Sequence, residues 1–132
     1  MLFRSALSKR WKKVGKCARN LETLDADQRH ELRKELKKLR YAVEFLSPLF
    51  PTKRVEPFAR RLRKLQTVFG ELNDAATVKT MFVHKAVRCA GDPEAQRAIG
   101  WVVGASQARA DSGWAGARGL WRKLEDTRLF WK

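Results

Sequence analysis

The stretch His30-Glu-Leu-Arg-Lys-Glu-Leu-Lys-Lys-Leu-Arg-Tyr41 decides the fold of the chain. On a helix, with about 100° between residues, its apolar side chains recur at spacings of four and three and form one stripe that continues past Tyr41. The stripe consists of Leu32, Leu36, Leu39, Val43 and Leu46. Because a helix with one apolar stripe buries it against other helices, the stretch predicts one member of a helical bundle.

The same stretch gathers its cations on the arc beside the apolar stripe. The arc carries His30, Arg33, Lys34, Lys37, Arg40 and Tyr41. Most of the neighbouring acids fall on the other flank, so the cations repel one another at a cost of roughly 0.2–0.5 kcal/mol per pair. We therefore expect an anion to bind there. For His30 alone, the alternative is a histidine at the edge of the core that caps the start of its own helix.

The composition indicates one domain with a strongly basic surface. The 132 residues suffice for a core, and 44% of them are apolar, as in ordinary globular proteins. Lys and Arg number 29 and Asp and Glu 14, which gives a net charge of +15. Such self-repulsion favours a polyanionic partner, namely nucleic acid, an anionic membrane surface or polyphosphate. We expect a single helical domain over residues 1–132.

The sequence indicates no metal site, no disulfide and no transmembrane segment. Cys17 and Cys89 stand far apart, without a CxxC motif or a histidine at metal-ligand spacing, so we expect reduced thiols and no metal or cofactor. No apolar run approaches the roughly 20 residues that span a bilayer, so we expect no transmembrane segment. The cysteine usage fits the cytoplasm. The alternative is a transit peptide, because the N-terminus is basic and has no acid before Glu22.

Capping and breaking residues divide the chain into four helices. Asp25 with Gln28 forms a capping-box pattern, and Pro48 ends the helix that follows. Gly91-Asp92-Pro93-Glu94 combines a helix stop with the cap and first turn of the next helix. The expected helices cover residues 2–21, 26–47, 54–88 and 93–127, with Ser112-Gly113 and Gly116 as candidate positions for a break in the fourth. Short connections between four helices predict an all-α, antiparallel four-helix bundle.

The third helix has its own apolar stripe and a polar seam beside it. The stripe consists of Leu62, Leu65, Phe69, Leu72, Ala76, Val83 and Val87. The cations Arg60, Arg63 and Lys64 and the polar residues Gln66, Asn73 and Asp74 are the candidate partners of the second helix. Helices joined by a short turn lie antiparallel, so we expect one basic groove between helices two and three. We expect Gln66, Asn73 and Asp74 to orient its cations, and Gly70 to allow a close approach of a helix or a ligand.

Two motifs together resemble the CHAD family, the conserved histidine α-helical domain. The first is His30-x-x-Arg33-x-x-x-Lys37-x-x-Arg40-Tyr41, and the second is Leu65-Gln66-x-x-Phe69-Gly70-x-Leu72-Asn73-Asp74-Ala75. Phe130-Trp131 is also similar to the way such domains end, whereas Phe69 stands where the family usually has leucine. The resemblance implies a helical domain that binds inorganic polyphosphate through a basic groove or pore.

The resemblance also implies a missing half. Family members are similar to a pair of four-helix halves related by a pseudo-twofold axis, and this chain corresponds to one half of the C-terminal type. It is then a truncated product, a fragment of a longer CHAD protein or a minimal version. The expected partners are a second copy in a homodimer, or an N-terminal half on another polypeptide.

Three functions fit the sequence. The first is non-catalytic binding of inorganic polyphosphate, because the sequence offers neither an acid cluster for Mg²⁺ nor a Gly-rich phosphate loop. Asp74 is then an orienting residue rather than a general base. The second is sequence-tolerant binding of RNA or DNA, with tryptophans as stacking platforms. The third is binding to a membrane surface through the first helix around Trp11.

Overall fold

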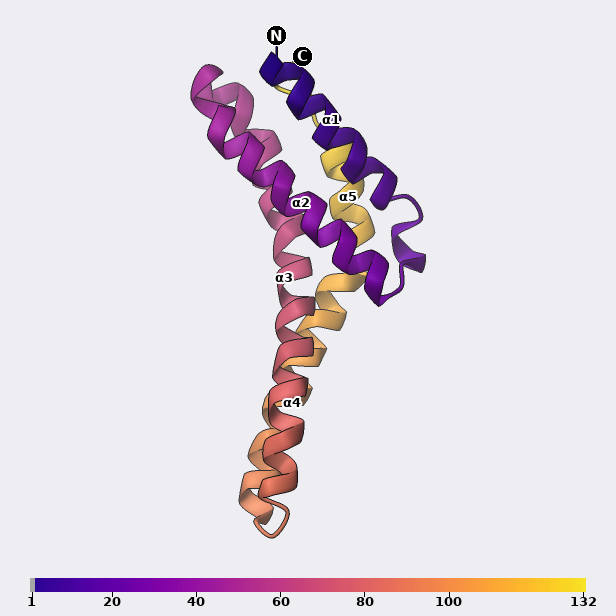
Figure 1. Ribbon diagram of the computed structural model, residues 1–132, viewed down its shortest axis with the longest axis vertical. Coiled ribbons are helices and arrows are strands. Elements are labelled where there is room, and N and C mark those ends of the chain that lie inside the picture. Colours follow the sequence, from indigo (N-terminus) through magenta and orange to yellow (C-terminus); the bar gives the residue numbers. More distant parts are fainter. Residues whose placement is uncertain (1) are drawn as a thin grey trace. The chain divides into compact units, whose positions relative to one another are not determined.

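Five α-helices and two short 3₁₀ turns make up residues 2–132, which the computed structural model describes; Met1 lies outside them (Figure 1). The helices are α1 (Leu2–Cys17), α2 (Ala26–Leu46), α3 (Thr52–Arg88), α4 (Pro93–Ala115) and α5 (Ala117–Glu125), and the 3₁₀ turns are Leu21–Thr23 and Ser47–Leu49. The described residues contain no strand. The prediction of an all-α helical bundle is confirmed.

The helices divide into two compact units, and α3 runs through both. Met1–Thr67 and Ala117–Lys132 form the first, which we call the bundle unit; it holds α1, α2, the first part of α3 and α5. Val68–Gly116 forms the second, which we call the hairpin; it holds the rest of α3 and α4. The predicted fourth helix is thus two helices that separate at Gly116, one of the candidate break positions.

The helix boundaries follow from local capping. Asp25 accepts a hydrogen bond from the backbone N–H of Gln28 at 2.8 Å, and the Gln28 side chain accepts one from the Asp25 N–H at 2.9 Å. Asp92 in the same way accepts from the first N–H groups of α4. The first helix ends at Cys17, before the expected end at Leu21, because the chain then turns through Asn20 in the left-handed region, at φ 54°.

The core of the bundle unit is made by one apolar stripe from each helix. Its fully buried side chains are Leu7 and Val14 of α1, Leu32, Leu36 and Leu39 of α2, Phe58, Leu62 and Leu65 of α3, Leu124 of α5, and Phe130 and Trp131 after it. The stripe predicted for the second helix is therefore the buried one, with Val43 at 2% exposure.

Phe58 lies at the centre of an aromatic cluster in this core. The ring centroids of Trp11, Phe130 and Trp131 lie 5.5, 5.8 and 5.2 Å from that of Phe58, all close to edge-to-face. Trp131 also donates a hydrogen bond from its indole nitrogen to Ser8 Oγ at 3.0 Å. The cluster joins α1 and α3 to the C-terminal segment, and Trp11 takes part in it as a packed, half-buried ring.

No helix within residues 2–132 combines the length and the apolar character needed to cross a membrane.

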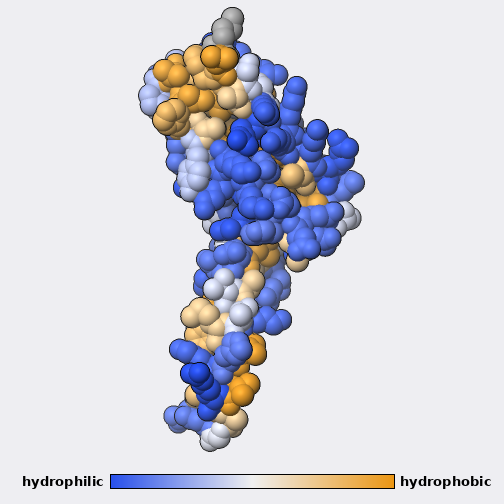
Figure 2. Space-filling view, viewed as in Figure 1, coloured by the Kyte–Doolittle hydropathy of each residue, from blue (hydrophilic) through white to orange (hydrophobic). Residues whose placement is uncertain are grey.

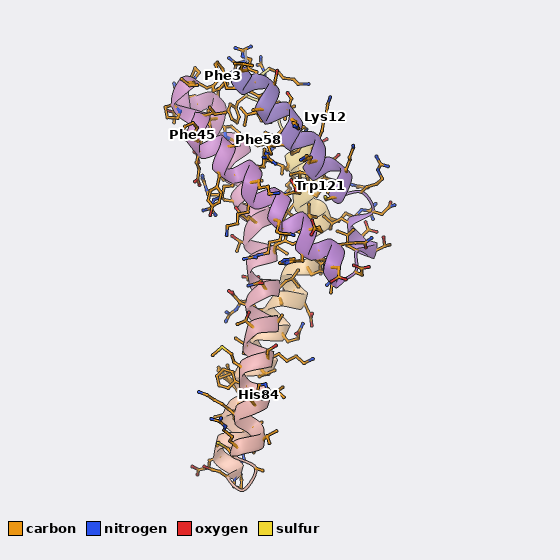
Figure 3. All side chains as sticks on the ribbon, in the orientation of Figure 1. Phe3, Lys12, Phe45, Phe58, His84 and Trp121 are labelled. Carbon is orange, nitrogen blue, oxygen red and sulfur yellow. The ribbon has the colours of Figure 1, made fainter. Side chains whose placement is uncertain are left out.

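Replacing Phe58 by alanine should lower the free energy of unfolding by about 3–5 kcal/mol, because it removes a fully buried ring and leaves a cavity. The matched control is Phe45→Ala on α2, whose side chain is 83% exposed (Figure 3) and whose loss should cost under about 0.5 kcal/mol. Urea denaturation followed by circular dichroism measures both. Equal losses would show that Phe58 is not central to the core.

Candidate functional site

The net charge of the chain belongs entirely to the bundle unit. This unit carries 24 of the 29 Lys and Arg residues and nine of the 14 Asp and Glu residues, which accounts for the whole +15. The hairpin carries five of each and is neutral. Hydrophilic residues cover much of the face of the bundle unit that Figure 2 shows. Any attraction of a polyanion by net charge therefore acts on the bundle unit.

The basic arc of α2 lies at the surface because the apolar stripe beside it is buried. With Leu32, Leu36 and Leu39 fully buried, the rotation of α2 is fixed. The side chains of the predicted arc differ in how exposed they are. Arg33 and Arg40 are half-buried at its edge, and His30, Lys34, Lys37 and Tyr41 are exposed. These side chains therefore lie on α2 beside its buried stripe, and what that face binds stays a prediction.

Tyr41 separates two of the cations. Its ring centroid lies 5.9 Å from Lys37 Nζ and 5.7 Å from Arg40 Cζ, and its side chain is 52% exposed. Both distances allow a cation–π contact, which attracts a cation without neutralising it. Both cations therefore lie near the ring, which does not itself neutralise either charge.

Acidic residues pair with only some of the candidate cations. Lys34 lies 2.7 Å from Glu31, and Arg40 Nε lies 3.0 Å from Glu44. Such exposed pairs contribute about 0–1 kcal/mol and exchange readily. The hydrogen bond and the charge of Lys34 lower the pKa of Glu31 below its ordinary value. Within residues 2–132, Arg33 and Lys37 form no ion pair with a carboxylate.

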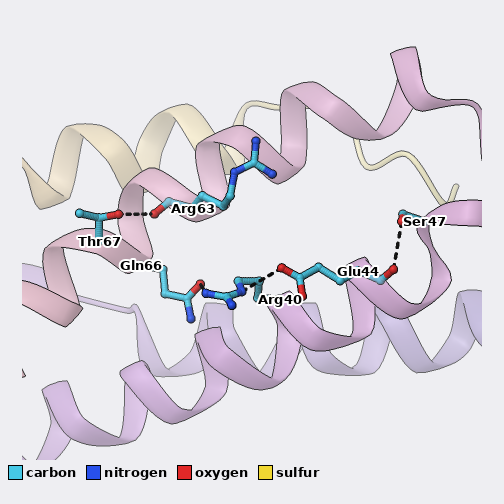
Figure 4. Close-up of polar contacts among 6 residues, drawn as sticks. All are labelled: Arg40, Glu44, Ser47, Arg63, Gln66 and Thr67. Atoms are coloured by element: carbon cyan, nitrogen blue, oxygen red, sulfur yellow. Dashed lines mark hydrogen bonds and ion pairs between the residues drawn. The ribbon is translucent and has the colours of Figure 1, made fainter.

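One hydrogen bond joins the basic arc of α2 to α3. Arg40 Nη1 donates to Gln66 Oε1 at 3.2 Å, while its Nε donates to Glu44 (Figure 4). The guanidinium is therefore held from both sides, and the orienting role of Gln66 toward a ligand stays a prediction. This is the contact that the predicted pairing of helices two and three requires.

The cationic side chains of α3 have different neighbours. Arg63 turns to Glu56 on its own helix, at 2.9 Å, and its side chain is 53% exposed. Arg60 and Lys64 instead line a hollow of about 200 Å³, together with Arg61 of α3 and with Leu120 and Lys123 of α5. No carboxylate lines this hollow. Two of the cations expected in a groove between helices two and three thus line a basic hollow between α3 and α5, and the groove itself stays a prediction.

Arg61 and Lys123 were not predicted to take part. Arg61 Nη1 donates hydrogen bonds to the Lys123 carbonyl and to the hydroxyl of Thr127, which holds its guanidinium at the hollow. The adjacent pair Arg60-Arg61 was the only sequence signal. It was insufficient because it did not show that Arg61 bonds to Lys123 and Thr127.

Three predicted residues of the polar seam lie in the hairpin. Asn73 is half-buried and accepts a hydrogen bond from Thr77 only through its backbone carbonyl, and Asp74 is exposed. Their orienting role stays a prediction. At Gly70 no described atom lies within 4 Å of the position of an added Cβ. No helix of the described chain therefore approaches Gly70 closely, and the expected approach of a ligand stays a prediction.

The described residues offer no metal site. Within residues 2–132 no group of three or more His, Cys, Asp or Glu side chains is placed to hold an ion. Cys17 and Cys89 are both free thiols. Burial, and then the charges of Glu35 and Glu31, raise the pKa of Cys17 above its ordinary value, so this thiol stays protonated at neutral pH.

Comparison with models of known protein families shows to which family the chain belongs. The model of the CHAD domain matches residues 2–83, which is more than half of the chain. The chain belongs to the CHAD family. The matched CHAD segment includes both motifs, from His30 to Tyr41 and from Leu65 to Ala75. Searches of curated proteins and of solved structures gave no match.

The contact between Arg40 and Gln66 should be measurable in a double-mutant cycle. With Arg40→Ala, Gln66→Ala and the double variant, we expect a coupling of about 0.5–1.5 kcal/mol in the free energy of unfolding. The exposed pair Arg63 and Glu56 is the control and should couple by less than about 0.5 kcal/mol. A coupling for Arg40 and Gln66 no larger than that of the control would contradict the link between α2 and α3.

Proposed function

We propose that this CHAD chain binds inorganic polyphosphate, without turning it over, on the basic arc of α2. The observation that carries the proposal is the run of Arg33, Lys37 and Arg40 along one helix face, in a unit that holds the entire net charge of a CHAD family member. Arg33 and Lys37 have no carboxylate partner in the described chain, so an external anion is the available counter-charge.

The spacing of the arc suits a linear chain of phosphates. Cations three and four residues apart on a helix are about 5–6 Å from one another, and the run from His30 to Tyr41 rises about 16 Å. A polyphosphate laid along α2 would meet one cation after another. Arginine presents a planar fork to phosphate oxygens, whereas lysine presents a point charge.

The hollow at α3 and α5 offers further cations to the same ligand. Arg60 and Lys64 line it together with Arg61 and Lys123, so four positive charges meet there without a carboxylate. A polyphosphate that is longer than α2 would gain contacts there. We include Arg63 as well, because its pair with Glu56 is exposed and easily exchanged.

We propose binding alone as the activity because the sequence lacks a Gly-rich phosphate loop and a cluster of acids for Mg²⁺. We propose Asp74 as an orienting residue rather than a general base. A second chain, as a homodimer or as a separate N-terminal CHAD half, would extend the basic surface, and this stays a prediction.

Nucleic acid is the second candidate, and one observation favours it. Tyr41 and Phe45 are 52% and 83% exposed and lie one turn apart on α2, beside Lys37. Exposed aromatic rings beside cations can stack bases. Base stacking by tryptophan is less favoured, because Trp11, Trp121 and Trp131 pack against other rings in the bundle unit.

The proposal predicts that position matters more than charge. Arg33→Ala with Lys37→Ala should weaken binding of long-chain polyphosphate by about tenfold or more, because two charge-assisted contacts are lost. Lys9→Ala with Lys12→Ala on α1 removes the same charge from exposed positions and should have a much smaller effect. Isothermal titration at fixed salt measures both. Equal losses would mean that only the net charge attracts the ligand.

A competition titration separates the two polyanions. Because polyphosphate needs only a row of cations, single-stranded RNA at equal phosphate concentration should fail to displace it. Binding should also weaken steeply as salt rises, since counterions are released. Efficient displacement by RNA, abolished in Tyr41→Ala with Phe45→Ala, would instead support nucleic acid as the ligand.

A further inference from the structure

The apolar stripe of α3 is buried where it enters the hairpin and becomes exposed further along. Leu62, Leu65 and Phe69 are at most 2% exposed. Further along the same stripe, Val83 and Val87 are 53% and 74% exposed. A sequence that keeps an apolar stripe at helical spacing normally buries it. The end of this stripe therefore lacks the covering element that its beginning has.

The partner helix in the hairpin is equally uncovered. Ala110 is the only fully buried residue among the 23 of α4. Trp101 is 76% exposed, which is unusual for a side chain that buries so much apolar area when it is packed. Two helices that share so little buried surface are marginal on their own, because tertiary packing supplies most of the stability of a helix.

Contacts inside the hairpin fix which sides of the two helices face each other. The Gln96 side chain donates hydrogen bonds to the carbonyls of Ala86 and Cys89 at 2.6 and 2.9 Å. With the two helices turned in this way, an apolar stripe of α3 and two glycines of α4 lie on the same lateral side of the hairpin, next to the contact between the helices. We call it the ridge–groove side; its members are Ala76, Val83, Val87, Gly100 and Gly104.

The ridge–groove side has the form of a helix-packing surface. Val83 and Val87 project from α3, whereas nothing lies within 4 Å of the position of an added Cβ at Gly100 or Gly104. Each glycine inside a helix costs about 1 kcal/mol relative to alanine. No contact within the described chain explains that cost, whereas a neighbouring helix that approaches the backbone closely would.

Charge indicates what kind of partner fits. The hairpin carries five cationic and five anionic residues, whereas the bundle unit carries +15. Two copies that met through their bundle units would repel each other strongly, but two hairpins would not. A neutral surface also offers little to a polyanion or to an anionic membrane, both of which select for cations. Apolar side chains are visible at the surface of the hairpin in Figure 2.

We propose that the hairpin is a self-association surface, on which the ridge–groove side packs against that of a second copy. A twofold axis would place Val83 and Val87 of each copy over Gly100 and Gly104 of the other, so that one surface is complementary to itself. The product is a neutral pair of hairpins made of four helices, with Trp101 at the edge of the contact. The association needs no polyphosphate and does not depend on the proposed function.

The available area suits a weak dimer. The hairpin part of α3 has a length of about 30 Å, and two packed helices are about 20 Å wide. The flat footprint of one side is therefore on the order of 600 Å², and protruding side chains add to this area. Stable interfaces bury about 800 Å² per partner, which one hairpin side approaches. We therefore expect a dimer that dissociates on dilution.

Sedimentation equilibrium over a range of concentrations, without any polyanion and at high salt, tests the proposal. The unsubstituted chain should reach twice the monomer mass, because salt screens the repulsion between the bundle units and does not weaken apolar contacts. Val83→Glu with Val87→Glu should stay monomeric. Phe45→Glu, which changes an even more exposed apolar residue of the bundle unit, should still dimerise. A monomeric unsubstituted chain at every concentration would overturn the proposal.

A second variant excludes unfolding as the cause of dissociation. Gly100→Leu with Gly104→Leu fills the groove, yet it raises the helix propensity of α4 and meets open space within the chain. It should therefore be monomeric with undiminished helicity by circular dichroism. A dimer that persisted in both the valine and the glycine variants would overturn the ridge–groove side as the contact.

Discussion

The rotation of α2 about its own axis is the constraint on which the candidate site depends. Burying a leucine contributes about 1.5–3 kcal/mol, and α2 buries Leu32, Leu36 and Leu39 completely. Repulsion between neighbouring cations costs only roughly 0.2–0.5 kcal/mol per pair. Burial therefore decides how the helix is turned, and the cations are held side by side at the surface although they repel one another. An anion that binds there gains from a repulsion that folding has already overcome.

The chain separates its charge from its exposed apolar surface. All of the net charge lies in the bundle unit, and the neutral hairpin exposes Val83, Val87 and Trp101. A protein that must bind a polyanion and a protein partner benefits from this division, because a charged contact between copies would compete with the ligand. Under the two proposals, the bundle unit binds polyphosphate and the hairpin joins two chains.

The features that could be predicted from the sequence are local ones. The capping box at Asp25 and the burial of Leu36 follow from residues within one or two turns, and both were predicted. Features that depend on distant segments were missed. The break at Gly116 lets α5 pack in the bundle unit, which brings Lys123 to the hollow that Arg60 lines. Helical spacing identifies an apolar stripe, but it cannot show whether this chain or another covers its end.

An NMR titration of the labelled chain with long-chain polyphosphate tests the central claim most directly. Side-chain and backbone signals of Arg33, Lys37 and Arg40 should shift first and saturate together, because the ligand lies along one face of α2. Signals of Lys9 and Lys12 on α1 should follow only at higher ligand concentration. Shifts that spread evenly over both helices from the first addition would contradict a defined site and would leave net charge as the whole attraction.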